Sequence, residues 1–162
     1  MAQYEVPTPS TLLLRMVGPE RAAAALRMLD ECLPAAVAPT AGDFRVATLS
    51  DVSSDTSMAP LAACVVHHQL IEPAAWIARF AVSLPFRRRG LGRRLLAELS
   101  RALQAEGAQR LWIRASDKHP AVHALLAGTG FVVCTADPIG EFPAGLRASE
   151  DDPEAAWWVR EL

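Results

Sequence analysis

An arginine- and glycine-rich loop between an apolar strand and an amphipathic helix constrains this chain more than any other feature. Residues 76–83 have the apolar, β-favouring composition of a strand, and residues 87–94 read RRRGLGRR. Apolar side chains then recur at helical spacing, at Leu91, Leu95, Leu96, Leu99 and Leu103. Gly107 follows where a helix C-terminus favours a left-handed residue. The pattern predicts a strand, a tight loop and a helix over residues 90–106.

Two glycines in this loop, Gly90 and Gly92, are placed to bind an anion. The first N–H groups of a helix have no intrahelical partner and carry a partial positive charge, so they attract phosphate. Because glycine has no Cβ atom, phosphate oxygens can approach its amide closely. Neighbouring arginines add charge-assisted hydrogen bonds. The spacing is neither G-x-G-x-x-G nor G-x-x-x-x-G-K-[ST], so the loop predicts a phosphate cradle of another type.

The arginine cluster, residues 87–89 with 93 and 94, has two other interpretations. It could be a solvated helix start, or a patch that binds nucleic acid, since arginine binds phosphates in general. The interleaved aromatic side chains of such patches are absent, and the formal net charge of the chain is only −2. We therefore expect no nucleic-acid partner.

Composition favours a non-exported protein without a membrane span. No run of eighteen apolar residues is present, and residues 1–10 lack the features of a signal peptide. Three widely spaced cysteines, Cys32, Cys64 and Cys134, predict buried, reduced thiols. We expect a cytoplasmic location and no membrane partner.

Periodicity along the rest of the chain predicts a mixed α/β domain. Strands are expected at residues 11–17, 44–49, 61–70, 76–83, 111–115, 131–135 and 157–159, and helices from Gly18-Pro19-Glu20 onward, over 90–106 and over 120–126. Helical crossovers require parallel neighbours, and three successive strands without helices favour antiparallel ones. We predict one domain over residues 1–162, of class α/β (α+β mixed), with helices on both faces of a central sheet.

The loop also carries a family resemblance. Arg87-x-x-Gly90-x-Gly92, after a strand that ends Phe80-Ala81-Val82, resembles the acyl-CoA signature [RQ]-x-x-G-x-[GA] of the GNAT N-acetyltransferase superfamily. The match extends to Gly130-Phe131 and covers about residues 76–133. The resemblance implies a mostly antiparallel sheet with a splayed parallel strand pair. It also implies direct transfer of an acetyl group from acetyl-CoA to a primary amine in a ternary complex.

Site residues follow from the resemblance. It implies that the pyrophosphate of acetyl-CoA binds the amides of Arg88, Arg89, Gly90, Leu91, Gly92 and Arg93. Arg87 and Arg94 are implied as side-chain partners, and His119 as a further contact. Pantetheine is implied to lie beside Phe80, Ala81 and Val82, where a backbone amide would polarise the thioester carbonyl.

The residues usual in the family for the general acid and base have no direct match in this sequence. Aligning Gly130-Phe131 with the family places Leu126 where a tyrosine acid often stands, and the only tyrosine is Tyr4. The CoA thiolate could leave unassisted or through water, or the protein could bind acyl-CoA without efficient turnover. Positions 78 and 79 offer no carboxylate, so the candidate catalytic residues are Glu72, Asp117, Glu141 and His67.

Two alternatives remain open at this point. A non-catalytic acyl-CoA sensor would keep the cradle without turnover. Self-association into a homodimer is also left open.

The acidic stretch 137–154 is either a solvated loop or a lid that attracts a cationic amine. The acceptor is expected to be a small amine or a lysine or N-terminal amine. His119 and His123 lack a third ligand, so no metal is expected.

Overall fold

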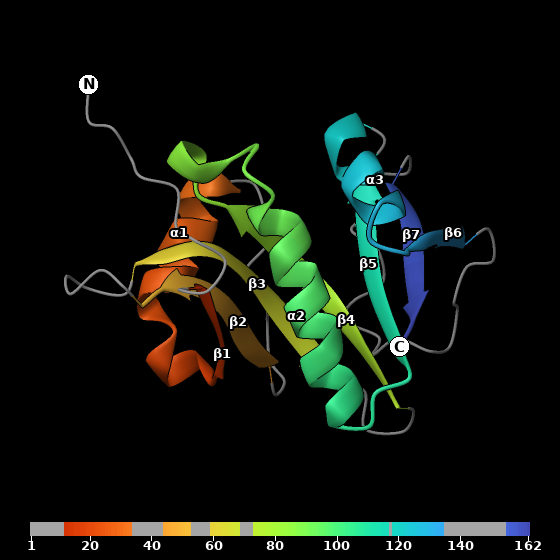
Figure 1. Ribbon diagram of the computed structural model, residues 1–162, viewed down its shortest axis with the longest axis horizontal. Helices are drawn as coiled ribbons and strands as arrows, with labels where there is room; N and C mark the ends of the chain where they lie inside the picture. Colours follow the sequence, from red (N-terminus) through yellow and green to blue (C-terminus); the bar gives the residue numbers. More distant parts are fainter. Residues whose placement is uncertain (1–11, 34–43, 53–58, 69–72, 117, 135–154) are drawn as a thin grey trace.

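The computed structural model describes residues 12–33, 44–52, 59–68, 73–116, 118–134 and 155–162 (Figure 1). Its strands are β1 (Leu12–Val17), β2 (Phe44–Asp51), β3 (Pro60–His68), β4 (Ala74–Val82), β5 (Arg110–Ser116), β6 (Val132–Cys134) and β7 (Ala155–Glu161). Its helices are α1 (Ala23–Cys32), α2 (Leu91–Ala105) and α3 (Pro120–Ala127), with 3-10 turns η2 (Pro19–Arg21) and η3 (Leu84–Phe86). The strands form one seven-stranded sheet in the order β1-β2-β3-β4-β5-β7-β6.

The pairing of β4 with β5 is parallel, whereas the other neighbouring strands are antiparallel. The parallel register runs from Ala74 opposite Arg110 to Ile77 opposite Ile113 and then stops. Beyond that point the two strands diverge toward the end of the molecule that carries η3 and α3 (Figure 1). The expected splayed strand pair in a mostly antiparallel sheet is therefore confirmed.

A β-bulge at Ala78 changes which face the side chains of β4 meet. In the ladder with β3, Ile77 lies opposite Val66 and Arg79 lies opposite Val65, so Ala78 is one residue more than its partner strand has. Ile77 packs in the core under α2, whereas Arg79 contacts α1. Because of the bulge, Ile77 and Arg79 lie on opposite faces of the sheet although they are two residues apart.

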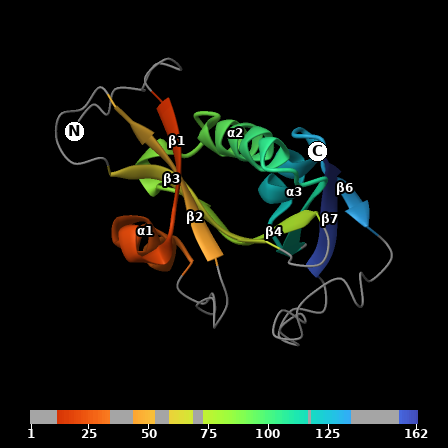
Figure 2. The same ribbon diagram turned by 90° about the horizontal axis from the view of Figure 1, so that it is seen from below.

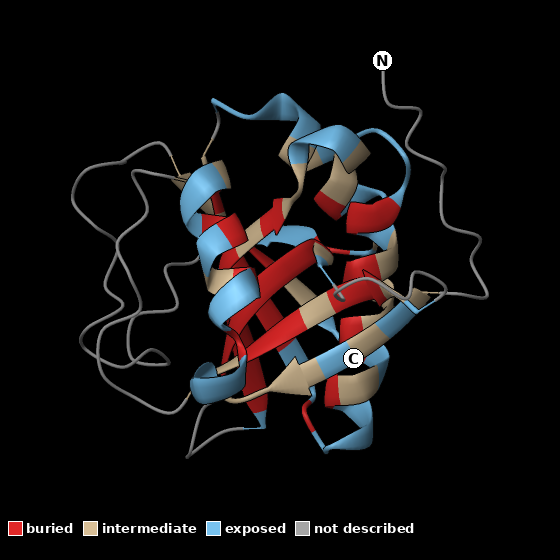
Figure 3. Ribbon diagram, turned by 90° about the vertical axis from the view of Figure 1, so that its left-hand side faces the viewer, coloured by how far each residue is buried: buried red, intermediate tan, exposed pale blue. Residues whose placement is uncertain are grey.

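Helices cover both faces of the sheet, as predicted (Figure 2). On one face α1 contributes Ala25 and Leu29 to a cluster with residues of β2, β3 and β4. On the other face α2 buries its apolar stripe completely at Leu95, Leu96, Leu99 and Leu103. Figure 3 shows the buried residues along the sheet and on the inward sides of the helices. Each buried leucine contributes roughly 1.5–3 kcal/mol relative to an exposed one, so this stripe anchors α2.

Element boundaries agree with the sequence predictions except around two prolines. The segment beginning at Gly18 forms a separate 3-10 turn, and α1 starts only at Ala23. The predicted loop before the arginine cluster contains a 3-10 turn, η3, with Pro85 in its first turn. In both places the fixed φ of proline starts a short turn that the following residues do not continue as α-helix.

Cysteine burial differs from the expectation. All three cysteines are free, but only Cys64 is fully buried, and Cys32 and Cys134 are half-buried. Burial raises the pKa of the Cys64 thiol to about 12, which makes that thiol unreactive.

No helix in the described ranges combines the length and apolar character needed to cross a bilayer.

Candidate active site

The loop between β4 and α2 has an unusual backbone. Arg87 is extended, with φ −63° and ψ 158°, and Arg88 has a positive φ of 64°. Gly90 caps α2 in the left-handed conformation, with φ 77° and ψ 0°. This turn and the first residues of α2 lie at the end of the molecule where β4 and β5 are farthest apart (Figure 1). The loop therefore presents its amides beside the split in the sheet.

Several backbone donors in this turn have no backbone acceptor among the residues that the structure describes. The first residue of the turn to donate within the helix is Arg94, whose N–H bonds the Gly90 carbonyl oxygen at 3.0 Å. In the described part of the chain, no backbone hydrogen bond is donated by the N–H groups of Arg88 and residues 90–93. Together with the helix dipole, these donors form a site that fits a phosphate group.

The two glycines of the motif have different structural roles. A Cβ atom on Gly90 would meet nothing within 4 Å, but its positive φ disfavours other residues. A Cβ on Gly92 would lie 3.2 Å from Leu125 Cδ2 and 3.3 Å from Phe80 Cζ. The absence of a Cβ on Gly92 therefore lets α2 lie close to β4 and α3.

The arginines of the cluster also differ from one another. Arg87 Nε donates a hydrogen bond to the Val82 carbonyl oxygen at 3.1 Å, which holds the loop against the end of β4. Arg94 forms an ion pair with Glu98 at 2.8 Å, and Arg89 lies over the Phe86 ring with its guanidinium 5.8 Å from the centroid. Arg88 and Arg93 are exposed to solvent beside the helix start.

A groove of about 190 Å³ occupies the split between β4 and β5. Its described lining consists of residues 77–80 of β4, residues 113–116 of β5, His119 and Val122 at the start of α3, and Leu33. Phe80 and His119, two of the residues expected to contact CoA, are among the described residues that line this groove. Ala81 faces the α1 cluster instead, and Val82 packs against the core under α2.

The position aligned with a tyrosine acid does not face the groove. Leu126 is 1% exposed and belongs to the main core, whereas His119 and Val122 lie on the side of α3 that lines the groove. The described groove residues include neither a tyrosine nor a carboxylate. Tyr4, Glu72, Asp117 and Glu141 lie outside the described residues.

His67 is the one candidate base that the structure describes. It is buried, and its ring stacks on Trp76 with centroids 4.7 Å apart and an interplanar angle of 3°. Burial, and then the neighbouring His68, lower its pKa below the usual value, so the ring is neutral at pH 7. His67 is not among the described residues that line the groove.

Comparisons with known proteins agree with this geometry. Residues 43–131 match the model of the "Acetyltransferase (GNAT) family". The chain belongs to the GNAT acetyltransferase family. Membership makes it an enzyme that transfers an acyl group from an acyl-CoA to an amine. A comparison with curated protein sequences finds no match.

Solved structures of GNAT proteins share the fold at low sequence identity. A GCN5-related N-acetyltransferase from Kribbella flavida aligns with a TM-score of 0.65 and 17% identity, over 96% of this chain and 100% of that one. The ribosomal-protein-S18-alanine N-acetyltransferase from Escherichia coli aligns with a TM-score of 0.63 and 19% identity, over 93% of each chain. A chain of the NatC complex, solved with Gag peptide and CoA, aligns with a TM-score of 0.65 and 15% identity, over 93% of this chain and 98% of that one.

The sequence analysis missed two groove residues of this GNAT chain. Arg79 and Arg114 both line the groove. Arg79 is 5% exposed and pairs with Asp30 of α1, with Arg79 Nη2 2.9 Å from Asp30 Oδ1. The signal was present, because Arg79 is the one charged residue in the strand AAWIARFAV. The family comparison of residues 78 and 79 considers only whether a carboxylate is present there.

Proposed function

We propose that this protein transfers the acetyl group of acetyl-CoA to a primary amine by direct attack in a ternary complex. The observation that carries the proposal is the set of unpartnered amides at the start of α2, beside the split between β4 and β5. The pyrophosphate would bind the amides of Arg88, Arg89, Gly90, Leu91, Gly92 and Arg93. Arg87 and Arg94 would add positive charge around it.

The acyl end of the substrate would lie in the groove. Phe80 and His119 line the groove, and we propose that they contact the pantetheine arm, while Ala81 and Val82 support the strand beneath. Because the β4 ladder with β5 ends at Ile77, backbone groups beyond the bulge are available to polarise the thioester carbonyl. This polarisation would stabilise the oxyanion that forms on attack.

The reaction needs a neutral amine and a stable leaving group. An alkyl amine with pKa about 10.4 is neutral in only about one molecule in two thousand at pH 7. Its nitrogen attacks the thioester carbon, the C–S bond breaks, and the electron pair leaves on the CoA thiolate. The proton from nitrogen passes to water or to a base, for which Glu72, Asp117, Glu141 and His67 remain candidates. A thiolate leaves without an acid far more readily than an alkoxide, so a tyrosine is not essential.

A non-catalytic acyl-CoA sensor is the second candidate. It is favoured by the lack of a carboxylate and a tyrosine among the described groove residues. Calorimetric titration with acetyl-CoA and a free-thiol assay over an amine panel separate the two. Binding with thiol release supports the enzyme, and binding without it supports the sensor.

Gly90 offers a matched pair of variants that test the cradle. Asn and Asp both tolerate a left-handed φ and have similar shapes, and nothing lies within 4 Å of the added Cβ. Gly90→Asp should weaken acetyl-CoA binding at least tenfold relative to Gly90→Asn, because its charge repels the pyrophosphate. An acidic residue at a helix N-terminus is stabilising, so lost folding cannot explain the difference. Equal affinities in the two variants would refute the placement.

A cytoplasmic location is also part of the proposal. The three cysteines are free thiols, which fits a reducing compartment. The proposed partners are acetyl-CoA and an amine acceptor.

A further inference from the structure

Arg79 is a buried cation with incomplete hydrogen bonding. Its side chain is 4% exposed, and its ion-pair partner Asp30 is 68% exposed on α1. Arg79 Nε has no hydrogen-bond partner among the residues that the structure describes. Burying a guanidinium with an unused donor is costly unless a ligand completes its contacts. The groove that Arg79 lines is the place where such a ligand would bind.

Arg114 brings a second positive charge to the same side of the groove. It lies two residues after Trp112 on β5, so both side chains are on the same face of the sheet, the α1 face, where Trp112 packs beside Trp76. Arg79 faces α1 too, because of the bulge at Ala78. Both arginines line the groove, and none of its described lining residues is acidic. The α1 side of the groove is therefore electropositive.

The opposite side of the groove has a different character. Ile113 belongs to the core under α2 and α3, and Phe80 and Val122 pack against that core. These apolar side chains lie on the face of the sheet that carries the cradle at the start of α2. On the proposed function, on which this inference rests, the acyl chain follows that apolar side. The acceptor then meets the thioester from the α1 side, past Arg79 and Arg114.

We propose that the acceptor is a small amino acid, whose carboxylate binds Arg79 and Arg114 while its amine attacks the thioester. Arginine recognises carboxylates through paired, charge-assisted hydrogen bonds. Asp30 is exposed, so it can yield its contact to the carboxylate of the substrate. The described lining offers Arg114 and the Asp30-paired Arg79 but no carboxylate to bind a polyamine, which sets this substrate class apart from purely cationic amines.

Matched acceptors test the substrate class. Small amino acids are compared with their C-terminal amides and their decarboxylated amines by thiol release, with kcat/KM expressed per neutral amine because the amine pKa differs among the three. The kcat/KM of the acid should exceed that of its amide and of its amine at least tenfold. Most of this difference should come from a lower KM and less of it from a higher kcat. Equal values, or a preference for a polyamine, would overturn the proposal.

Variants separate recognition from a purely structural ion pair. Arg79→Gln and Arg114→Gln should bring the acid-to-amide ratio close to one while acetyl-CoA affinity is retained. Asp30→Asn should keep or raise the ratio, since it frees Arg79 for the substrate. If Arg79→Gln and Asp30→Asn lower it equally, the pair is structural and the proposal fails. Arg101→Gln, at an exposed position on α2, is the control and should change nothing.

A binding experiment keeps this inference distinct from the proposed function. In the presence of CoA, an N-acetyl amino acid should bind at least tenfold more tightly than its amide by calorimetry, and Arg79→Gln should abolish the difference. This measurement needs no turnover. Failure to bind acetyl-CoA would defeat the proposed function, whereas turnover of amines without preference for the acid would defeat only the present inference.

Discussion

Gly90, Gly92 and Leu126 align with functional positions of the family, but they have different structural roles in this chain. Gly90 is favoured by its φ of 77°, and Gly92 because an added Cβ would lie only 3.3 Å from Phe80 Cζ. Leu126, aligned with a catalytic position of the family, is instead part of the core. A position in a motif therefore has to be interpreted from what its side chain touches.

Leu126→Ala should lower the free energy of unfolding by about 2–5 kcal/mol, because it removes a fully buried side chain and leaves a cavity. Chemical denaturation measures the loss. The specific activity of the folded fraction should stay unchanged, since Leu126 does not line the groove. Val122→Ala is the matched control, and its half-buried side chain should cost less stability but should change the KM for acetyl-CoA. A loss of rate at full stability in Leu126→Ala would contradict this assignment.

Among the elements, α2 was the easiest to predict. Its leucine stripe recurs at helical spacing, and the helix begins and ends within one residue of the expected bounds. The bulge at Ala78 could not be predicted, because it depends on the ladder with β3, which the sequence does not show. For the same reason Arg79 could not be assigned to the groove. Local periodicity therefore predicted the elements and the phosphate loop, whereas the acceptor side required the tertiary structure.

Gly107→Ala should cost about 1 kcal/mol of stability, because Gly107 follows α2 with φ 95°. Nothing lies within 4 Å of an added Cβ, so the loss would be conformational and not steric. Gly107→Asn is the matched control, since asparagine tolerates the left-handed region better and should lose less. Thermal and urea unfolding of the three proteins provide the comparison. Equal stability of all three would show that the turn relaxes.

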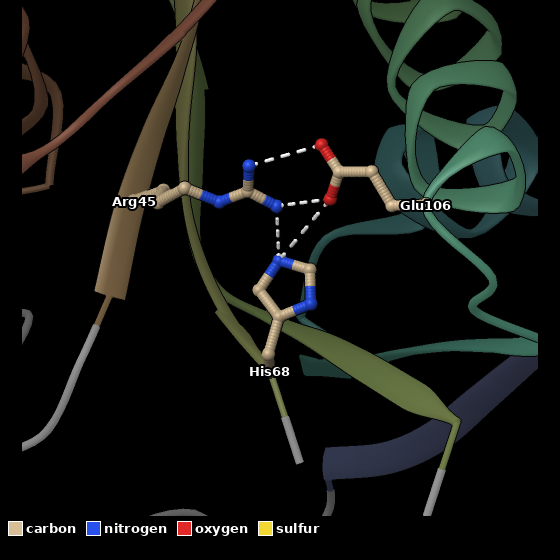
Figure 4. Close-up of polar contacts among 3 residues, drawn as sticks. All are labelled: Arg45, His68 and Glu106. Atoms are coloured by element: carbon tan, nitrogen blue, oxygen red, sulfur yellow. Dashed lines mark hydrogen bonds and ion pairs between the residues drawn. The ribbon is translucent and has the colours of Figure 1, made fainter. Parts of the chain in front are cut away.

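At the scale of the whole molecule, polar contacts tie the far end of α2 to the sheet. Arg45 of β2 donates hydrogen bonds to Glu106 and contacts His68 Nε2 (Figure 4). The hydrogen bond from Arg45 holds the pKa of Glu106 below its usual value. Burial, followed by the charge of Arg45, lowers the pKa of His68. The folded state therefore favours a neutral His68, as it favours a neutral His67.

Stability should fall as the pH drops below about 6.5, the ordinary pKa of histidine. Because the pKa values of His67 and His68 are lowered by folding, the unfolded chain binds more protons in that range, and acid favours unfolding. Urea denaturation at pH 7.5 and pH 5.5 measures the change. His68→Gln should reduce the pH dependence of the free energy of unfolding. The double variant His67→Phe/His68→Gln should reduce it further. A pH-independent free energy of unfolding would contradict the neutral assignment.

The short parallel ladder between β4 and β5 has a mechanical consequence. Among the described residues, the ladder that joins the four-stranded half of the sheet to the three-stranded half has four residue pairs, residues 74–77 with 110–113. A molecule bound in the split would contact both halves and would connect them where the ladder between them is short. Its binding free energy would then oppose separation of the two halves. Binding of the acyl donor would therefore also make the part of the sheet that contacts the acceptor more rigid.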